Sequence, residues 1–347
     1  MNIQDLIRPT IKALKPYSSA RDEFQGNSDD MVFLDANENP FENGVNRYPD
    51  PQQRTLKSLL SKIKGVPQQN ILLGNGSDEV LDLIYRAFCE PNQDNIITLP
   101  PTYGMYSVLA NINAIEIKSV QLDADFQPKV DEILNTSNAN SKLLFLCSPN
   151  NPTGNSFEAK SIERLMKAFK GIVVIDEAYI DFSNAESWAS RLNEFSNLII
   201  TQTLSKAYGM AGIRLGICFA SEEIISVLNR IKPPYNVNAL TQQKAISQLE
   251  QQELTQNQVT GILKERDLLI TKLESVDYIS KIYPSDANFL LAKVDNATKR
   301  YNQLIDKGIV IRNRTSQPGC ENCLRFTIGT PKENEKLIKE LLLISRF

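Results

Sequence analysis

The 347-residue sequence predicts an α/β fold, with a large domain built on a mostly parallel sheet and a smaller α+β domain. Short runs that are apolar at successive positions recur along the chain, which is typical of strands covered on both faces. Segments with helical periodicity lie between several of these runs. Around residues 232–235 the pattern changes, and this change marks the beginning of a second domain.

The apolar runs are expected to be the strands of the large sheet. In chain order they are residues 71–73, 96–99, 112–117, 143–147, 172–175, 198–203 and 215–219. After the first of them, residues 78–89 carry one apolar stripe at helical spacing, which predicts a helix.

The second part of the chain is expected to form the smaller domain. A long helical region, at about 238–275, precedes the remaining elements. The last of these, residues 331–347, begins with a proline, which is favoured at the start of a helix. Between them lie three short predicted strands, at 288–294, 309–312 and 324–328. We therefore expect a large domain at 31–240, a small domain at 241–347, and an arm, residues 1–30, that packs on the small domain.

The sequence contains no histidine, which restricts its chemistry. A Ser-His-Asp or Cys-His relay and any histidine-ligated metal site are excluded. Proton transfer near neutral pH must rely on a perturbed lysine, cysteine, tyrosine or carboxylate, or on a cofactor. Cys320 and Cys323 form a C-x-x-C pair, but without a second pair they do not complete a zinc site. We interpret them as ordinary thiols and expect no metal.

The charge balance excludes several classes of partner. Lys plus Arg is 38 and Asp plus Glu is 41, so the net charge of −3 offers no general attraction to nucleic acid or anionic lipid. No uncharged apolar run approaches the ~18 residues of a membrane span. Asp5, Arg8 and Lys12 lie where a signal peptide would need its apolar stretch. We expect a cytoplasmic protein.

Lys206 is the first candidate for chemistry. It follows the predicted strand 198–203 and lies in the run SKAYGMAGIR, residues 205–214. Its glycines allow a bulky group to approach the backbone. Desolvation, or a nearby cation such as Arg214, would favour the neutral and nucleophilic amine. A surface lysine before a helix is the alternative interpretation.

Three further motifs place polar groups at the ends of predicted strands. CSPNNPTG forms a turn that projects Asn150 and Asn151, and IVVIDEAY delivers Asp176 at the carboxyl edge of a buried strand, where α/β sheets bind ligands. Asp176 could equally cap the next helix. GNGSDE is a glycine turn before a helix, and its N–H groups form a potential anion site. It is not a dinucleotide fingerprint, because Glu79 occupies the third glycine position.

In this order and spacing, these motifs and PTYGMY at 101–106 resemble the fold-type I aminotransferases, which use pyridoxal 5′-phosphate (PLP). The resemblance extends over about residues 7–345 and implies a mostly parallel seven-stranded sheet in the large domain. It is closest to the histidinol-phosphate aminotransferase branch, through PYSSAR at 16–21, LDANENP at 34–40, NRYPD at 46–50 and CLRFTIGT at 323–330.

The resemblance implies roles around the cofactor ring. Lys206 matches the lysine that binds PLP covalently and moves the reacting proton, and Asp176 matches the carboxylate that keeps the ring nitrogen protonated. Tyr179 and Asn151 match donors to the phenolic oxygen of the ring. Tyr103 matches the aromatic side chain that stacks on it.

The resemblance also implies a phosphate site and a homodimer. Tyr48 matches a tyrosine that reaches the cofactor phosphate from the neighbouring subunit, so the active sites would be shared. The residues of this chain that match the phosphate site are Ser77, Asp78, Thr203, Ser205 and Arg214.

For the substrates, Arg325 matches the arginine that grips the α-carboxylate of glutamate, a contact suited to a planar guanidinium. Arg312 and Tyr17 match positions at the phosphate of histidinol phosphate, and Asn151 also borders the substrate. The implied reaction is a reversible transamination in which histidinol phosphate and 2-oxoglutarate give imidazole acetol phosphate and glutamate, a step of histidine biosynthesis. Alternatively, Arg325 could face solvent, and Arg312 and Arg314 could form an ordinary charged turn.

Three rival functions share this resemblance. An aromatic aminotransferase and a threonine-phosphate decarboxylase have the same fold. A PLP-sensing transcription factor would need a DNA-binding module, for which the aminotransferase pattern leaves no room.

Overall fold

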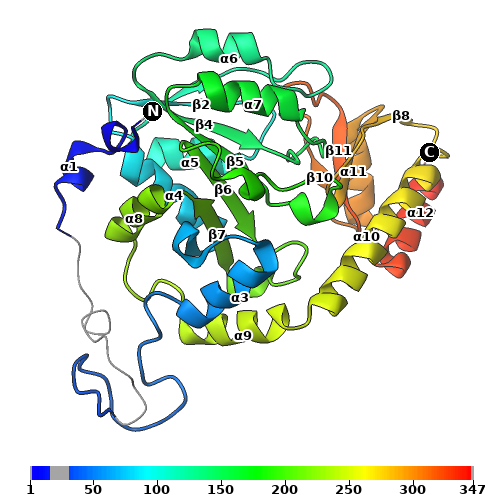
Figure 1. Ribbon diagram of the computed structural model, residues 1–347. Coiled ribbons are helices and arrows are strands. Elements are labelled where there is room, and N and C mark those ends of the chain that lie inside the picture. Colours follow the sequence, from blue (N-terminus) through cyan, green and yellow to red (C-terminus); the bar gives the residue numbers. More distant parts are fainter. Residues whose placement is uncertain (1, 16–30, 345–347) are drawn as a thin grey trace.

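The structure, a computed structural model, describes residues 2–15 and 31–344 (Figure 1). Its larger sheet confirms the predicted fold class. The strand order is β1-β7-β6-β5-β4-β2-β3. The strands are β1 (Ile71–Asn75), β2 (Asn95–Thr98), β3 (Glu116–Ser119), β4 (Ser141–Cys147), β5 (Ile172–Asp176), β6 (Leu198–Thr203) and β7 (Leu215–Ala220).

All neighbouring strands of this sheet are parallel except where β7 is inserted, antiparallel to both β1 and β6. The carboxyl ends of β1, β4, β5 and β6 therefore meet at one edge of the sheet. Every residue of β5, β6 and β7 is buried, as expected for strands covered on both faces. The predicted run 112–117 is partly wrong, because Ile112 ends a helix and the strand begins only at Glu116.

Helices cover the two faces of the sheet, and alternate strand residues supply the two cores. One core takes Leu73, Leu144 and Ile200 from the strands, and the other takes Leu72, Leu143 and Ile199. The helices on the first face are α3 (Arg54–Lys64), α6 (Val130–Thr136) and α7 (Ala159–Ala168), and those on the second are α4 (Ser77–Phe88), α5 (Met105–Ile112) and α8 (Glu222–Ile231). Short 3₁₀ turns complete the connections: η2 (Gln68–Asn70), η3 (Ile180–Phe182), η4 (Trp188–Arg191) and η5 (Ala211–Ile213).

The smaller domain contains a four-stranded antiparallel sheet in the order β10-β11-β9-β8. Its elements are α10 (Gln252–Leu273), β8 (Ile279–Ile282), β9 (Phe289–Val294), α11 (Ala297–Asp306), β10 (Arg312–Asn313), β11 (Cys323–Thr327) and α12 (Pro331–Ile344). The predicted strand 309–312 shrinks to two residues, and β8 was not predicted because it is an edge strand without a fully buried residue. Helix α12 begins at the proline that the sequence indicated.

The packing places the division between the domains later than residue 240. Helix α9 (Ala239–Leu249) packs on α3 of the large domain. The separate core of the small domain takes its first residue, Leu269, from the second half of α10. This favours a boundary within α10.

The expectation that the N-terminal arm packs on the small domain is wrong for residues 2–15. Ile3 and Ile7 are buried in the core formed by α4 and α8, because their spacing of four residues presents both to the large domain. The Arg8 N–H donates to the carbonyl of Ala87 at 3.0 Å, and its side chain pairs with Glu90. The arm consists of η1 (Ile3–Asp5) and α1 (Pro9–Lys12), which lies beside α8 (Figure 1).

Residues 31–50 leave the body of the molecule as an extended loop (Figure 1). The loop exposes apolar side chains, among them Val32 at 83%, Leu34 at 86% and Phe41 at 79%. Among residues 2–15 and 31–344, no helix is both long enough and apolar enough to cross a membrane.

Candidate active site

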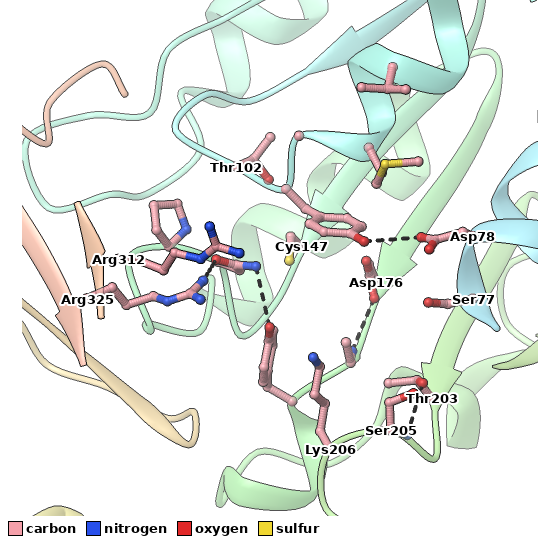
Figure 2. A pocket seen from close by; sticks show the side chains of 18 of the residues that line it. Ser77, Asp78, Thr102, Cys147, Asp176, Thr203, Ser205, Lys206, Arg312 and Arg325 are labelled. Carbon is pink, nitrogen blue, oxygen red and sulfur yellow. Dashed lines mark hydrogen bonds between the residues drawn. The ribbon is translucent and has the colours of Figure 1, made fainter. Parts of the chain in front are cut away.

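A cavity of about 550 Å³ lies at the carboxyl edge of the large sheet, where it faces β10 and β11 of the small domain (Figure 2). The sheet and its loops contribute most of the polar wall, and the small domain contributes the basic wall. The predicted residues that line the cavity are Ser77, Asp78, Tyr103, Asn151, Asp176, Tyr179, Thr203, Ser205, Lys206, Arg214, Arg312 and Arg325.

Lys206 points into this cavity from the loop after β6 (Figure 2). Its Nζ lies 5.9 Å from the centroid of the Tyr179 ring. Partial desolvation and the charge of Arg325 lower the pKa of the Lys206 amine, while the carboxylate of Asp176 opposes this shift. A lowered pKa increases the share of the neutral amine, which is the form that reacts as a nucleophile or a base.

Asp176 is the last residue of β5 and is buried. One carboxylate oxygen accepts a hydrogen bond from the Tyr106 hydroxyl at 2.7 Å, and the other accepts one from the backbone N–H of Ala178 at 3.1 Å. Burial raises the pKa of Asp176, and the bond from Tyr106 opposes that shift. Within the described residues the carboxylate has no ion-pair partner, so it can accept a cationic group from a ligand.

The start of α4 forms a cradle for an anion. Its N-cap is Gly76, which offers no side chain to the free backbone N–H groups. A Cβ on Gly76 would lie 2.7 Å from the Arg214 guanidinium, and one on Gly216 would lie 2.3 Å from the Ser77 nitrogen. The glycines therefore allow β7 and Arg214 to approach the helix start. Backbone N–H groups, a guanidinium and the neighbouring hydroxyls of Thr203 and Ser205 suit a phosphate.

Asn151 connects the two walls of the cavity. Its Nδ2 donates to the hydroxyl oxygen of Tyr179 at 3.4 Å, and its Oδ1 accepts a hydrogen bond from the guanidinium of Arg325 (Figure 2). Asn150, by contrast, turns away and holds the loop through the Pro101 carbonyl at 2.9 Å. Of the two asparagines in this turn, only Asn151 reaches the cavity.

The basic wall comes from two paired strands. Arg325 on β11 lies opposite Arg312 on β10, and both line the cavity, with Arg325 half-buried and Arg312 exposed. Burial and the nearby Arg314 lower the pKa of Arg325 to about 10. A cluster of like charges that face one cavity indicates an anionic ligand.

Of the predicted residues that the structure describes, Tyr48 does not line the cavity. Tyr48 is half exposed and stacks on Tyr235, with ring centroids 4.5 Å apart. Tyr17 lies outside the described residues. Cys320 and Cys323 are buried free thiols, and within the described residues no cluster of metal-ligating side chains was found.

Sequence reasoning missed three contributors. Tyr106, in the PTYGMY motif, supplies the bond to Asp176, and nothing in the motif indicates this contact because its partner lies 70 positions away. Arg314 and Gln317 also line the cavity, and only the spacing of Arg314 from Arg312 could have indicated it.

These residues fit PLP. The buried carboxylate lacks a cation, the amine of Lys206 makes no hydrogen bond or ion pair within the described residues, and the glycine-lined start of α4 can take a phosphate. Tyr103 adds an aromatic ring, held by a bond from its hydroxyl to Asp78 at 3.1 Å.

Comparisons with known proteins agree with this arrangement. Residues 28–341 match the family of aminotransferase class I and II. The histidinol-phosphate aminotransferase of Flavobacterium johnsoniae is 63% identical over 345 residues, which covers 99% of each chain. A solved structure, the histidinol-phosphate aminotransferase from Clostridium acetobutylicum, has a TM-score of 0.80 at 25% identity and covers 87% of this chain and 91% of that chain. The enzyme from Sinorhizobium meliloti, solved in complex with pyridoxal-5′-phosphate, has a TM-score of 0.79 at 23% identity, covering 86% of this chain and 83% of that chain.

Proposed function

We infer the reaction from a plain premise: the chain belongs to the class I and II aminotransferases and, within them, to the histidinol-phosphate aminotransferases. Its activity is that of this family, a PLP-dependent transamination of histidinol phosphate in histidine biosynthesis. The observation that carries this function is one cavity in which Lys206 and Asp176 face the arginines of the small domain. The amino group is exchanged with 2-oxoglutarate, and the step proceeds in the cytoplasm.

The roles of the residues around the ring follow from their contacts. PLP, when bound, draws electrons away from the substrate carbon that loses a proton. The Lys206 amine, with its lowered pKa, would take this proton and move it between the two carbons that flank the transferred nitrogen. Asp176 would hold the ring nitrogen in its protonated form, because a buried carboxylate without an ion partner is stabilised by a nearby positive charge. Tyr179 and Asn151 orient the phenolic oxygen of the ring.

The two substrates use the basic wall in different ways. Arg325 holds the α-carboxylate of glutamate through its planar guanidinium, and Asn151 fixes that guanidinium by a hydrogen bond. Histidinol phosphate has no α-carboxylate, so its phosphate takes the same position. Arg312, opposite Arg325 on the neighbouring strand, adds charge for the phosphate.

A homodimer completes the site in this proposal. Arg214, at the phosphate end of the cavity, keeps 49% of its side chain exposed in the single chain. The loop 31–50 exposes the apolar side chains of Val32, Leu34 and Phe41, and Tyr48, which stacks on Tyr235, is half exposed. A neighbouring subunit would bury these side chains and receive Tyr48 at its cofactor phosphate.

The experiment that tests this function combines substrate choice with labelling of Lys206. The purified protein should react with histidinol phosphate and 2-oxoglutarate faster than with phenylalanine or threonine phosphate. Borohydride reduction and peptide mapping should place PLP on Lys206. The variant Lys206→Ala should still bind PLP noncovalently, since the phosphate and ring contacts remain, but it should lose essentially all turnover.

Other outcomes would assign the chain differently. Preference for phenylalanine would indicate an aromatic aminotransferase, and carbon dioxide release from threonine phosphate would indicate a decarboxylase. A label on another lysine would contradict the role of Lys206.

A further inference from the structure

Arg314 has no role in the function proposed above, although it lines the same cavity. Strands β10 and β11 pair in antiparallel register, with Arg312 opposite Arg325. The N–H of Arg314 donates to the carbonyl of Cys323 at 2.8 Å and so extends this pairing beyond Asn313. Because strand residues two apart face the same side, Arg314 shares a face with Arg312 and stands diagonal to Arg325.

Two of the three guanidinium groups, those of Arg314 and Arg325, are perturbed by their positive neighbours. The pKa of Arg314 is lowered by burial and by Arg312, and that of Arg325 is lowered by burial, Arg314 and Arg312. Like charges opposite each other destabilise a strand pair. In residues 2–15 and 31–344, no carboxylate forms an ion pair with any of the three. The fold therefore maintains a positive cluster that a bound anion would stabilise.

Unused hydrogen-bond donors point to the same conclusion. The Nε atoms of Arg314 and Arg325 are buried and have no hydrogen-bond partner among the described residues. Buried donors without a partner are rare in folded proteins. Arg314 is half-buried and lines the cavity, and its buried Nε is a donor that no atom of the described residues satisfies.

We propose that Arg314 is a third anion-binding residue, which makes the cavity selective for a doubly charged phosphate monoester over a carboxylate. This inference rests on the proposed function and deepens it. A carboxylate has one charge and two oxygens, which one guanidinium satisfies by two parallel bonds. A phosphate monoester carries nearly two charges and three acceptor oxygens at pH 7. With Arg314 added, the wall offers a phosphate more positive charge and more hydrogen-bond donors than Arg325 and Arg312 offer alone.

The test is Arg314→Gln, which keeps a long polar side chain and removes the charge. Single-turnover reactions of the PLP enzyme would be followed with histidinol phosphate, histidinol and glutamate. Affinity for histidinol phosphate should fall about ten- to a hundredfold, the range for a lost charge-assisted contact. The reactions with histidinol and glutamate should change less than about threefold, and Arg314→Lys should restore part of the loss.

Controls separate the outcomes. Arg164→Gln removes an exposed arginine paired with Asp131 and should change none of the three reactions. Circular dichroism and thermal melting would verify that each variant folds. Equal losses for histidinol and histidinol phosphate, or no loss for either, would overturn the role of Arg314. If the wild-type enzyme did not react with histidinol phosphate, the proposed function itself would fail, and this inference with it.

Discussion

The bond between Tyr106 and Asp176 offers a sharp test of how the site keeps its carboxylate charged. Both side chains are buried, and the hydroxyl lies 2.7 Å from the carboxylate oxygen. Tyr106→Phe removes this donor and keeps the ring, which stacks on Phe145 with centroids 4.8 Å apart. Within the described residues, the N–H of Ala178 would be the hydrogen-bond donor that remains to the carboxylate.

The magnitude follows from the kind of bond that is lost. A hydrogen bond to a charged group contributes about 1.5–3 kcal/mol. Without this bond the pKa of Asp176 should rise further above its ordinary value. Burial already raises this pKa, and the hydrogen bond from Tyr106 is the largest influence that opposes burial. Loss of that bond therefore adds to the upward shift. Less of the carboxylate is then ionised, and turnover should fall about ten- to a hundredfold.

The assay is kcat/KM across pH, with thermal melting of the same preparations. Because protonated Asp176 no longer supports the ring charge, the acidic limb of the profile should move to higher pH in Tyr106→Phe. Tyr85→Phe is the matched control, since its hydroxyl donates to the Tyr106 carbonyl at 2.7 Å and is also buried. It should cost about 0.5–1.5 kcal/mol of unfolding free energy and leave the profile unchanged. A wild-type rate and profile in Tyr106→Phe would refute the reasoning.

Three further predictions concern other parts of the site. Asp176→Asn keeps the shape of the carboxylate but removes its charge, so turnover should fall by orders of magnitude in a folded protein; a wild-type rate would show that the residue is only structural. Arg325→Ala should weaken the half-reactions with both glutamate and histidinol phosphate. Arg312→Ala should weaken mainly the half-reaction with histidinol phosphate, by about ten- to a hundredfold in single-turnover spectra. Equal losses with the two substrates in Arg312→Ala would contradict its role at the phosphate. Gly216→Ala would place a methyl group 2.3 Å from the first backbone nitrogen of α4, so PLP affinity in equilibrium dialysis should fall at least about tenfold and the melting temperature should drop. Gly212→Ala, with open space around its Cβ, should change neither.

The central strands could be predicted because their burial is two-sided. Residues 172–175 and 198–200 are apolar at consecutive positions, a pattern typical of strands covered on both faces. Strands at the edges of the two sheets do not need to be apolar on both faces. In β3 and β8 no residue is fully buried, so their composition does not differ from that of a loop. The N-terminal arm was misplaced because the choice of a partner surface for Ile3 and Ile7 depends on tertiary packing.

Residues of the site were predictable where local structure alone places them at a strand end. Asp176 ends one buried strand, Lys206 follows another, and Asn151 lies in a proline turn, so their positions could be derived from the chain itself. Tyr106 lies on a helix, and its role depends on a contact with a residue 70 positions away. Arg314 acquires its place from the pairing of two short strands, which the sequence does not specify.

The antiparallel insertion of β7 has a consequence for the order of assembly. It turns the chain back after β6, so Lys206 and Arg214 belong to one loop between two paired strands. Contacts between segments close in sequence form faster, because closing a short loop costs less chain entropy. The contact of Asn151 with Arg325, in contrast, spans 174 positions. During folding we therefore expect the loop that carries Lys206 and Arg214 to form early. The start of α4 and the basic wall both reach this loop through contacts that are distant in sequence, so the phosphate cradle and the substrate side are completed by later steps.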